Sequence, residues 1–503
     1  METLGFLMAG IGAAMQPGIL LAILVGVVIG LFISVLPGLG PAAGVAILLP
    51  VVVGLDGTMA MAALAGVYYG GMYGGAVTSI LLGIPGDAPS VMTVLDGHPM
   101  AQQGRAGDAL SMNVLASFFG GLFGLVMLVG VAYQVARFAL AFGPTEMTAL
   151  MVMALSLVSV LGGKDALKGF AALALGLWIG MVGLDVIGGF PRYHYGSMHL
   201  LSGLEFSVIA VGLFGLGQIF AAITQPPLQD SQKIRYTFRS LIPNPRELIR
   251  CRWDLLRGSV IGFVVGILPG VGATASTMLS YAVAKRFSRT PERFGKGAIE
   301  GVAAPEAANN SASYAAMIPL FTLGIPGSAT TAVLMGGLLM IGLQPGPQMF
   351  QQHSEFVWTL FGTFYIGNVA LVFLTILLIP VLASIVFVSR ALLFPMIICV
   401  VMFAVFSIGY SVANLWIVIV FGVLGYVMLR LDYPAVPLIL GVVLGPLLER
   451  AVRRTLIASQ GDMMVFLQRP IALTLFVLTA LFLLAPLAKR GLAAFARHRN
   501  AGS

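Results

Sequence analysis

Long apolar runs separated by short polar loops set the pattern of hydrophobic positions along this chain. Uninterrupted runs of spanning or near-spanning length fall at about 109–135, 148–161, 166–187, 204–223, 356–387, 391–408, 414–428, 435–448 and 470–487. Two further runs, about 68–95 and 309–341, contain Pro-Gly pairs that interrupt helical hydrogen bonding. The pattern predicts an all-α polytopic membrane protein with about 10–12 spanning helices.

The stretch 304–350 combines apolar and polar residues in a way that lipid does not tolerate on a simple helix. It carries Glu306, Asn309 and Asn310 at helical spacing on one face, followed by two Pro-Gly pairs. Irregular backbone at membrane depth persists only where it is buried in protein or lines a cavity. We therefore expect a broken helix at a solute site, with the asparagines donating to carboxylate or sugar oxygens. Capping of a helix at the membrane edge is the alternative.

Two motifs recur in the same order in both halves of the chain. Residues 30–44 read GLFISVLPGLGPAAG and residues 262–276 read GFVVGILPGVGATAS. Downstream, LLGIPGDAPS at 81–90 is matched by TLGIPGSATT at 322–331. Two paired matches at similar spacing indicate an internal duplication. We predict a first repeat over 1–224, a basic cytoplasmic linker over 225–257 and a second repeat over 258–503.

Basic residues predict the orientation of the repeats. The segment 258–284 has Lys and Arg clusters on both sides, so both of its ends are expected in the cytoplasm. A re-entrant hairpin with LPGVG at its tip satisfies this expectation, and a kinked span is the alternative. The matching segment 18–54 has no preceding Lys or Arg and would open from outside. The two repeats are therefore predicted to be inverted, each with a hairpin and a broken helix.

The Pro-Gly turns offer backbone groups to a solute. A helix that restarts after such a turn presents free N–H groups and a partial positive charge to an anion. We predict that this backbone contacts the substrate at Gly38, Gly40, Gly270 and Gly272. Carbonyl groups near Gly83 and Gly324, where helices end before the turns, are expected to face a Na⁺ ion. A packing kink is the alternative for each motif.

Polar side chains beside the turns complete the predicted site. Asp87 follows one turn directly and suits a cation site or a proton relay, with helix capping as the alternative. Its counterpart is Ser328, so the halves are not equivalent. We assign Thr78 and Ser79 to cation coupling, and Ser328 and Thr331 to substrate binding. For each hydroxyl, back-bonding to its own helix is the alternative.

Composition narrows the class of protein further. The 503 residues are 59% hydrophobic and only 9% charged, whereas a soluble domain has about 25% charged residues. The net charge of +8 comes from loop clusters and indicates membrane sorting, not nucleic-acid binding. No Walker A pattern and no His/Cys cluster is present. We predict no enzyme activity, no cofactor and no metal apart from a Na⁺ site.

Two stretches resemble a known family. Tyr68–Leu110 and Pro305–Gly337 are similar to the large membrane subunit of the bacterial tripartite tricarboxylate transporters, and the LPG motifs fit as well. The resemblance implies a multi-pass permease of the inner membrane that works with a small membrane subunit and a periplasmic solute-binding protein. It also implies uptake of citrate-like or other carboxylates driven by a Na⁺ or H⁺ gradient. His98 and Gly83 depart from the usual pattern, which leaves the substrate open.

Three other readings remain open at this point. An ion channel would show repeated polar rings along a continuous pore, whereas polar groups here gather at two paired breaks. A carboxylate transporter that works without a binding protein has the same membrane pattern. An intramembrane enzyme would require a nucleophile with a base, or a metal set, and the helical segments contain neither.

Overall fold

The computed structural model describes residues 2–36, 38–185, 187–224, 238–241, 244–270, 272–385 and 388–484. Regular structure in these ranges is helical apart from one antiparallel pair, β1 (Gly183–Leu184) with β2 (Pro191–Arg192). Packing separates the chain into two compact units. Unit 1 consists of Met1–Ala139 and Glu205–Leu431, and unit 2 consists of Leu140–Leu204 and Asp432–Ser503.

Unit 1 holds both copies of the repeated motifs. Its first-half helices are α1 (Glu2–Ala14), α2 (Pro17–Ser34), α3 (Pro41–Leu48), α4 (Gly57–Leu82), α5 (Val91–Gln102), α6 (Ala106–Ala139), α10 (Phe206–Ala210), the π-helix η1 (Val211–Leu216) and α11 (Gly217–Ile223). Its later helices are the 3₁₀ turn η2 (Phe238–Leu241), α12 (Pro245–Gly266), α13 (Gly272–Phe287), the 3₁₀ turn η3 (Pro291–Arg293), α14 (Glu300–Ala315), α15 (Met317–Leu323), α16 (Ala329–Met340), α17 (Met349–Gln352), α18 (Ser354–Ile385), α19 (Arg390–Ser407) and α20 (Val412–Arg430).

Unit 2 is built around one long helix. It contains α7 (Pro144–Leu161), α8 (Ala166–Gly180), the β1–β2 pair, α9 (Met198–Leu201), α21 (Ala435–Ala458), α22 (Val465–Gln468) and a helix over Pro470–Leu484. Helix α21 packs on both α7 and α8. Arg453 on α21 pairs with Asp185 beside β1 at 3.0 Å. Backbone N–H groups of Gly188 and Ile187, and then Arg453, lower the pKa of Asp185.

The helices confirm the predicted class, an all-α polytopic membrane protein. Seven helical segments among the described residues are long and apolar enough to cross a bilayer, namely α2, α6, α7, the α10–α11 segment, α18, α20 and α21. Shorter apolar helices occur at α1, α8, α16, Ala391–Ser407 and Pro470–Leu484. The predicted total of about 10–12 spans also counts broken and short helices, so it stays a prediction.

The last part of the basic linker predicted over 225–257 is helical, and the bounds of the linker stay a prediction. Helix α12 begins at Pro245, because Asn244 caps it through the Arg246 N–H at 3.1 Å and proline is favoured at the first helical position. The helix continues through the basic residues because Cys251 and Leu255 give it a buried face. Of the remainder, residues 225–237 and 242–243 lie outside the described residues.

The two halves use the same helix crossing. Helix α2 crosses α4, and α12 crosses α14. A Cβ atom added to Gly30 would lie 2.4 Å from the Val67 carbonyl oxygen, and one added to Gly262 would lie 2.3 Å from that of Ala308. These pairs occupy equivalent positions when the motifs are aligned. The shared register supports the predicted duplication, because glycine allows both crossings the same close approach.

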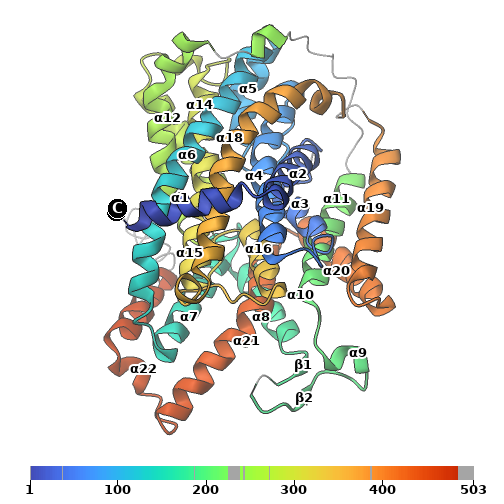
Figure 1. Ribbon diagram of the computed structural model, residues 1–503, viewed down its shortest axis with the longest axis vertical. Coiled ribbons are helices and arrows are strands. Elements are labelled where there is room, and N and C mark those ends of the chain that lie inside the picture. Colours follow the sequence, from blue (N-terminus) through green and yellow to red (C-terminus); the bar gives the residue numbers. More distant parts are fainter. Residues whose placement is uncertain are drawn as a thin grey trace, which may run out of the picture. The chain divides into compact units, whose positions relative to one another are not determined.

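Contacts between the halves also occur in matching pairs. Helix α5 packs on α14 while α16 packs on α4, and α6 packs on α14 while α18 packs on α4. Figure 1 shows α6, α12 and α14 side by side. The arm after each break is therefore held by the opposite half. The predicted repeats, 1–224 and 258–503, are defined by sequence similarity, whereas units 1 and 2 are defined by packing. The two divisions answer different questions, so the bounds of the repeats stay a prediction.

Replacing Gly262 by leucine is expected to destabilise unit 1 by about 1–3 kcal/mol or more, because α12 and α14 have to separate. Gly130 on α6 is the matched control, since it is exposed and a Cβ there meets nothing within 4 Å. Gly130→Leu should change stability by less than about 0.5 kcal/mol. Thermal unfolding of the purified chain in detergent measures both. Equal melting temperatures for the two variants would contradict the crossing.

The inverted orientation predicts opposite labelling of two cysteines. Cys399 is exposed and would react, so it is first changed to serine; Cys251 is buried. Single cysteines then replace Gly18, at the start of α2, and Ser288, after α13. An impermeant maleimide should label the first from outside the cell and the second only in inside-out vesicles. Labelling of both from the same side would rule out the inversion.

Candidate functional site

In the first half, the LPG and GIPG motifs meet. A Cβ atom on Gly40 would lie 3.4 Å from the Cβ of Asp87. The Gly86 N–H donates to the Gly75 carbonyl at 3.3 Å, which folds the turn back onto α4. A Cβ on Gly86 would come within 2.6 Å of the Ser34 carbonyl oxygen. The turn that carries Asp87 is therefore fixed between α4 and the end of α2.

The second half repeats this meeting with different contacts. The Gly270 N–H donates to the Gly327 carbonyl at 3.1 Å. Gly272 begins α13 with φ +64°, in the left-handed region, and a Cβ there meets nothing within 4 Å. Gly38 also has positive φ, at +89°, and is exposed. The predicted glycines thus lie at or beside the turns, whereas Pro37 at the first tip lies outside the described residues.

The hydroxyl groups of the predicted site bond to nearby backbone. Thr78 and Ser79 both donate to the Gly75 carbonyl at 3.0 Å, which is the back-bonding alternative. Ser328 and Thr331 cap α16 reciprocally, since each accepts a bond from the other's backbone N–H. Each hydroxyl oxygen keeps lone pairs that a bound cation can use.

Gly83 and Gly324 end α4 and α15 in left-handed conformations, with φ +70° and +68°. Glycine favours this helix end because it has no Cβ. His98 lies in α5. Its Nδ1–H donates to the Ile80 carbonyl at 3.1 Å, so this tautomer satisfies an orphan carbonyl at the end of α4.

Side chains from the two halves meet beside the breaks. The Thr93 hydroxyl of α5 donates to Glu306 Oε1 of α14. The Tyr68 hydroxyl of α4 donates to the Ser313 carbonyl at 3.3 Å, and Asn309 Nδ2 donates to the Met72 carbonyl at 3.4 Å. Asn310 instead bonds within its own helix, to the Glu306 carbonyl at 3.1 Å. The two breaks therefore face one region of unit 1.

Several buried polar atoms on the elements of this region have no hydrogen-bond partner. They are Ser34 Oγ, Tyr69 OH, Asp87 Oδ2, Glu306 Oε2, Asn309 Oδ1 and Tyr314 OH. Buried polar atoms normally have partners, so such a concentration calls for an explanation. Neither Asp87 nor Glu306 forms an ion pair among the described residues. These oxygen atoms are therefore the candidate ligands of this region.

Two residues of this region were missed by sequence reasoning. Thr93 gives no signal of its own, because its partner Glu306 is 213 residues away in the chain. Asp96 lies in the DGHP stretch, and its Oδ1 accepts four backbone N–H groups, from residues 295 to 298, at 2.8–3.1 Å. Its Oδ2 accepts from the Tyr281 hydroxyl at 2.8 Å. Asp96 thereby attaches α5 to the turn before α14.

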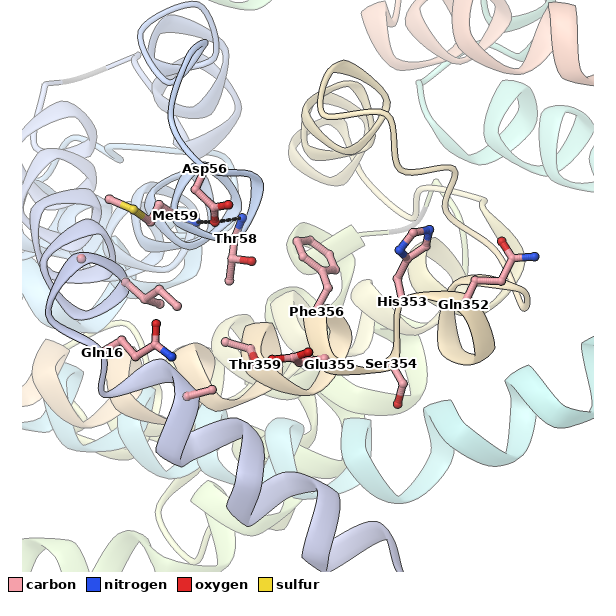
Figure 2. A pocket seen from close by; sticks show the side chains of 13 residues that line it. Gln16, Asp56, Thr58, Met59, Gln352, His353, Ser354, Glu355, Phe356 and Thr359 are labelled. Carbon is pink, nitrogen blue, oxygen red and sulfur yellow. Dashed lines mark hydrogen bonds between the residues drawn. The ribbon is translucent and has the colours of Figure 1, made fainter.

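A separate pocket of about 530 Å³ lies where α1, α4 and α18 have their ends. Figure 2 shows Asp56, Glu355 and His353 among the side chains around it. Asp56 caps α4 through the Thr58 N–H at 2.9 Å. Two carboxylates and no Lys or Arg line this pocket, so its charge does not favour an anionic substrate. None of the predicted site residues lines it.

Comparison with protein families shows which family this chain matches. The profile of the tripartite tricarboxylate transporter TctA family matches residues 20–440, which include both motif pairs and both breaks. The chain belongs to the TctA family. This assignment makes it a large subunit of a tripartite tricarboxylate transporter, and the TctA family is a family of transporters, not of enzymes. The resemblance at Tyr68–Leu110 and Pro305–Gly337 is thereby confirmed.

Two relatives of this TctA-family chain come from Agrobacterium vitis. One, described as an uncharacterized 52.8 kDa protein in the TAR-I ttuC' 3' region, is 37% identical over 475 residues, which is 94% of each chain. The other, an uncharacterized protein in the TAR-II ttuC' 3' region, is 41% identical over 214 residues, covering 42% of this chain and 88% of its own. No solved structure is significantly similar to this TctA-family chain.

Proposed function

We propose that this chain is the permease subunit through which a tripartite secondary transporter imports tricarboxylates, citrate-like or other organic carboxylates. A Na⁺ or H⁺ gradient drives the import across the bacterial inner membrane. A periplasmic solute-binding protein delivers the substrate, and a small membrane subunit completes the complex. The observation that supports this function best is the meeting of both LPG–GIPG motif pairs in unit 1, within the region that matches the TctA family.

The substrate carboxylate is held by backbone N–H groups and small polar side chains. No Lys or Arg occurs within either motif pair, so a buried arginine does not supply the positive charge. Gly40 and Gly272 stand at the N-terminal ends of α3 and α13, where free N–H groups favour an anion. A co-bound cation offsets the charge that would otherwise make a dry anion very costly. Moderate affinity suits release into the cytoplasm after a tighter partner has delivered the solute.

Uptake by proteoliposomes tests this proposal against the alternatives. The chain is reconstituted with its small membrane subunit, and labelled carboxylates are offered with and without the periplasmic protein under an imposed Na⁺ or H⁺ gradient. Saturable, gradient-dependent uptake that requires the periplasmic protein supports the proposal. Uptake that does not need it indicates an independent carboxylate transporter. Current that follows the electrochemical gradient of an ion without saturation indicates a channel.

Changing Asp87 to asparagine is expected to weaken the dependence of uptake on the driving cation. The substitution preserves the local turn, because the asparagine carbonyl can still accept the Ser90 N–H that Asp87 Oδ1 accepts at 3.0 Å. It therefore tests the charge alone. Uptake is measured over a range of Na⁺ concentrations and pH values, with Asp108→Asn as control because Asp108 forms a partly exposed ion pair with Arg105. Unchanged cation dependence would leave Asp87 only its capping role.

A further inference from the structure

The carboxylate of Glu306 is 1% exposed and lies in the middle of α14, beside the two breaks. One of its oxygens, Oε1, accepts the Thr93 hydroxyl, and the other, Oε2, has no partner. Proline and small residues surround it along the helix, and no Lys or Arg pairs with it among the described residues. An isolated ionised carboxylate in such a place is very costly unless something neutralises it.

Other oxygen atoms lie around the same carboxylate. Asn309 follows Glu306 by one helical turn, and its Nδ2 donates to the Met72 carbonyl of α4 at 3.4 Å. One turn further along α4, a Cβ atom on Gly75 would lie 2.9 Å from Asp87 Oδ1, so Asp87 and Asn309 contact neighbouring turns of the same helix. Asn309 is 1% exposed, and its Oδ1 has no partner because only its Nδ2 is used, toward Met72. Asp87 Oδ2 is likewise buried and unpartnered. Asp87 and Tyr73 are the titratable groups that face Glu306 from the packed elements.

This arrangement has a shortage of positive charge. Two carboxylates near one another in a buried region cannot both be ionised without a cation between them. Three buried oxygens here, from Glu306, Asp87 and Asn309, have no partner, and the Thr93 hydroxyl bonds to the other oxygen of Glu306. Oxygen-only ligands suit a proton or a hard cation such as Na⁺, and they do not suit an organic anion.

We infer that Glu306 carries the coupling charge, holding one monovalent cation against the Asp87 and Asn309 oxygens while Thr93 fixes the orientation of its carboxylate. The cation is a proton or Na⁺, which share this oxygen chemistry. The inference rests on the proposed function, in which a cation gradient drives import, and it assigns the central ligand to the second half of the chain. Asp87 then comes from the first half, so the ion bridges the halves.

Binding to the purified full-length chain tests the site without transport. The melting temperature is measured in detergent with Na⁺ replaced stepwise by choline at constant ionic strength, and separately from mildly acidic to mildly alkaline pH. If Na⁺ is the ion, wild type should be stabilised by Na⁺. If the proton is the ion, wild-type stability should fall as the pH rises, because a carboxyl that is neutral when buried must lose its proton.

Two variants and one control make the result specific. Glu306→Gln keeps the shape but stays neutral, so it should abolish whichever dependence wild type shows. Thr93→Val leaves the carboxylate but removes its positioning bond, so apparent Na⁺ affinity should fall about tenfold in the Na⁺ case, and the pH response should shift in the proton case. Glu355→Gln, at an exposed position in the separate pocket, should behave as wild type. Thr93→Val provides the test if Glu306→Gln does not fold.

The outcomes separate this site from the proposed function. Wild type that responds to neither Na⁺ nor pH, or Glu306→Gln that responds as wild type does, overturns the assignment of Glu306. In reconstituted transporter, Glu306→Gln with unchanged cation-driven carboxylate uptake also overturns it, while the proposed function stands. Cation binding that is lost in Glu306→Gln, in a protein that takes up no carboxylate, supports the site and contradicts the proposed substrate.

Discussion

Replacing Asp96 by alanine is expected to destabilise unit 1 by about 3–5 kcal/mol, because it removes the acceptor of five hydrogen bonds at once. Asp96 is fully buried. A Cβ atom on Gly301 would lie 2.1 Å from Asp96 Oδ2, so the surroundings are tightly packed. The free energy of unfolding of a typical domain is about 5–15 kcal/mol, so this loss is a large part of it.

Asp96→Asn should be milder, at about 1–2 kcal/mol. Its carbonyl oxygen can accept the four backbone N–H groups of residues 295–298, and its amide can donate to Tyr281 if that hydroxyl rotates. The variant therefore loses the charge of the acceptor but few of the bonds. The order of stability expected is wild type, then Asp96→Asn, then Asp96→Ala.

Thermal unfolding in detergent and the yield of monodisperse protein measure this order. Asp108→Asn is the control, because the Asp108–Arg105 ion pair is about one-third exposed and such pairs contribute about 0–1 kcal/mol. If Asp96→Ala has the same melting temperature as wild type, the turn before α14 is held by other contacts. The position of α5 would then need another explanation.

Valine at Gly40 is expected to lower carboxylate uptake by at least about 100-fold while leaving insertion and folding intact. Gly40 has extended backbone, with φ −77° and ψ 177°, which valine adopts without strain. The nearest atom to its new Cβ is the Asp87 Cβ at 3.4 Å, an ordinary contact. The effect then comes from a side chain that keeps the substrate away from the backbone of the LPG turn.

Valine at Gly272 should also abolish uptake, but for two reasons. Its φ of +64° is strained for a β-branched residue, by about 1–3 kcal/mol, so stability should fall as well. Gly272→Asn separates the effects, because asparagine tolerates left-handed backbone and still adds a side chain. We expect Gly272→Asn to fold nearly as wild type and to transport poorly.

Uptake of labelled carboxylate by proteoliposomes at equal protein content checks these variants. Gly130→Val is the matched control, since Gly130 is exposed on α6 and a Cβ atom there meets nothing within 4 Å. Normal transport by both valine variants would contradict binding through the turn backbone. So would a substrate complex in which an Arg or Lys head group holds the carboxylate.

The sequence predicts best those helices and turns that are determined by residues close together in the chain. Apolar runs placed six of the seven helices of spanning length, because length and hydropathy decide them. The seventh, α2, lies in the segment predicted as a re-entrant hairpin. The GIPG motifs placed the breaks, since Gly83 and Gly324 each end a helix in a left-handed conformation. The start of α12 was missed by thirteen residues, from Pro245 to Gly258, because a basic segment with few apolar residues resembles a loop until Cys251 and Leu255 are seen to be buried.

The candidate site was less predictable because its contacts span the chain. Asp87 and Asn309 were chosen for their positions beside the breaks, but nothing local connects Thr93 with Glu306 or Asp96 with residues 295–298. Periodicity also gave no sign that packing would join residues 140–204 to the C-terminal helices in a separate unit. Such pairings depend on tertiary packing, which single-sequence patterns do not encode.

The exchange of arms between the halves has a consequence for how the protein is made. Asp96 and Thr93 are synthesised long before the turn and the glutamate that they bind in the finished fold. Until the second half has been synthesised, the carboxylate and the hydroxyl therefore lack the partners that they have in the finished fold. Helix α5 can form these contacts only after residues 295–306 have been synthesised. The final position of α5 thus depends on translation of the second half.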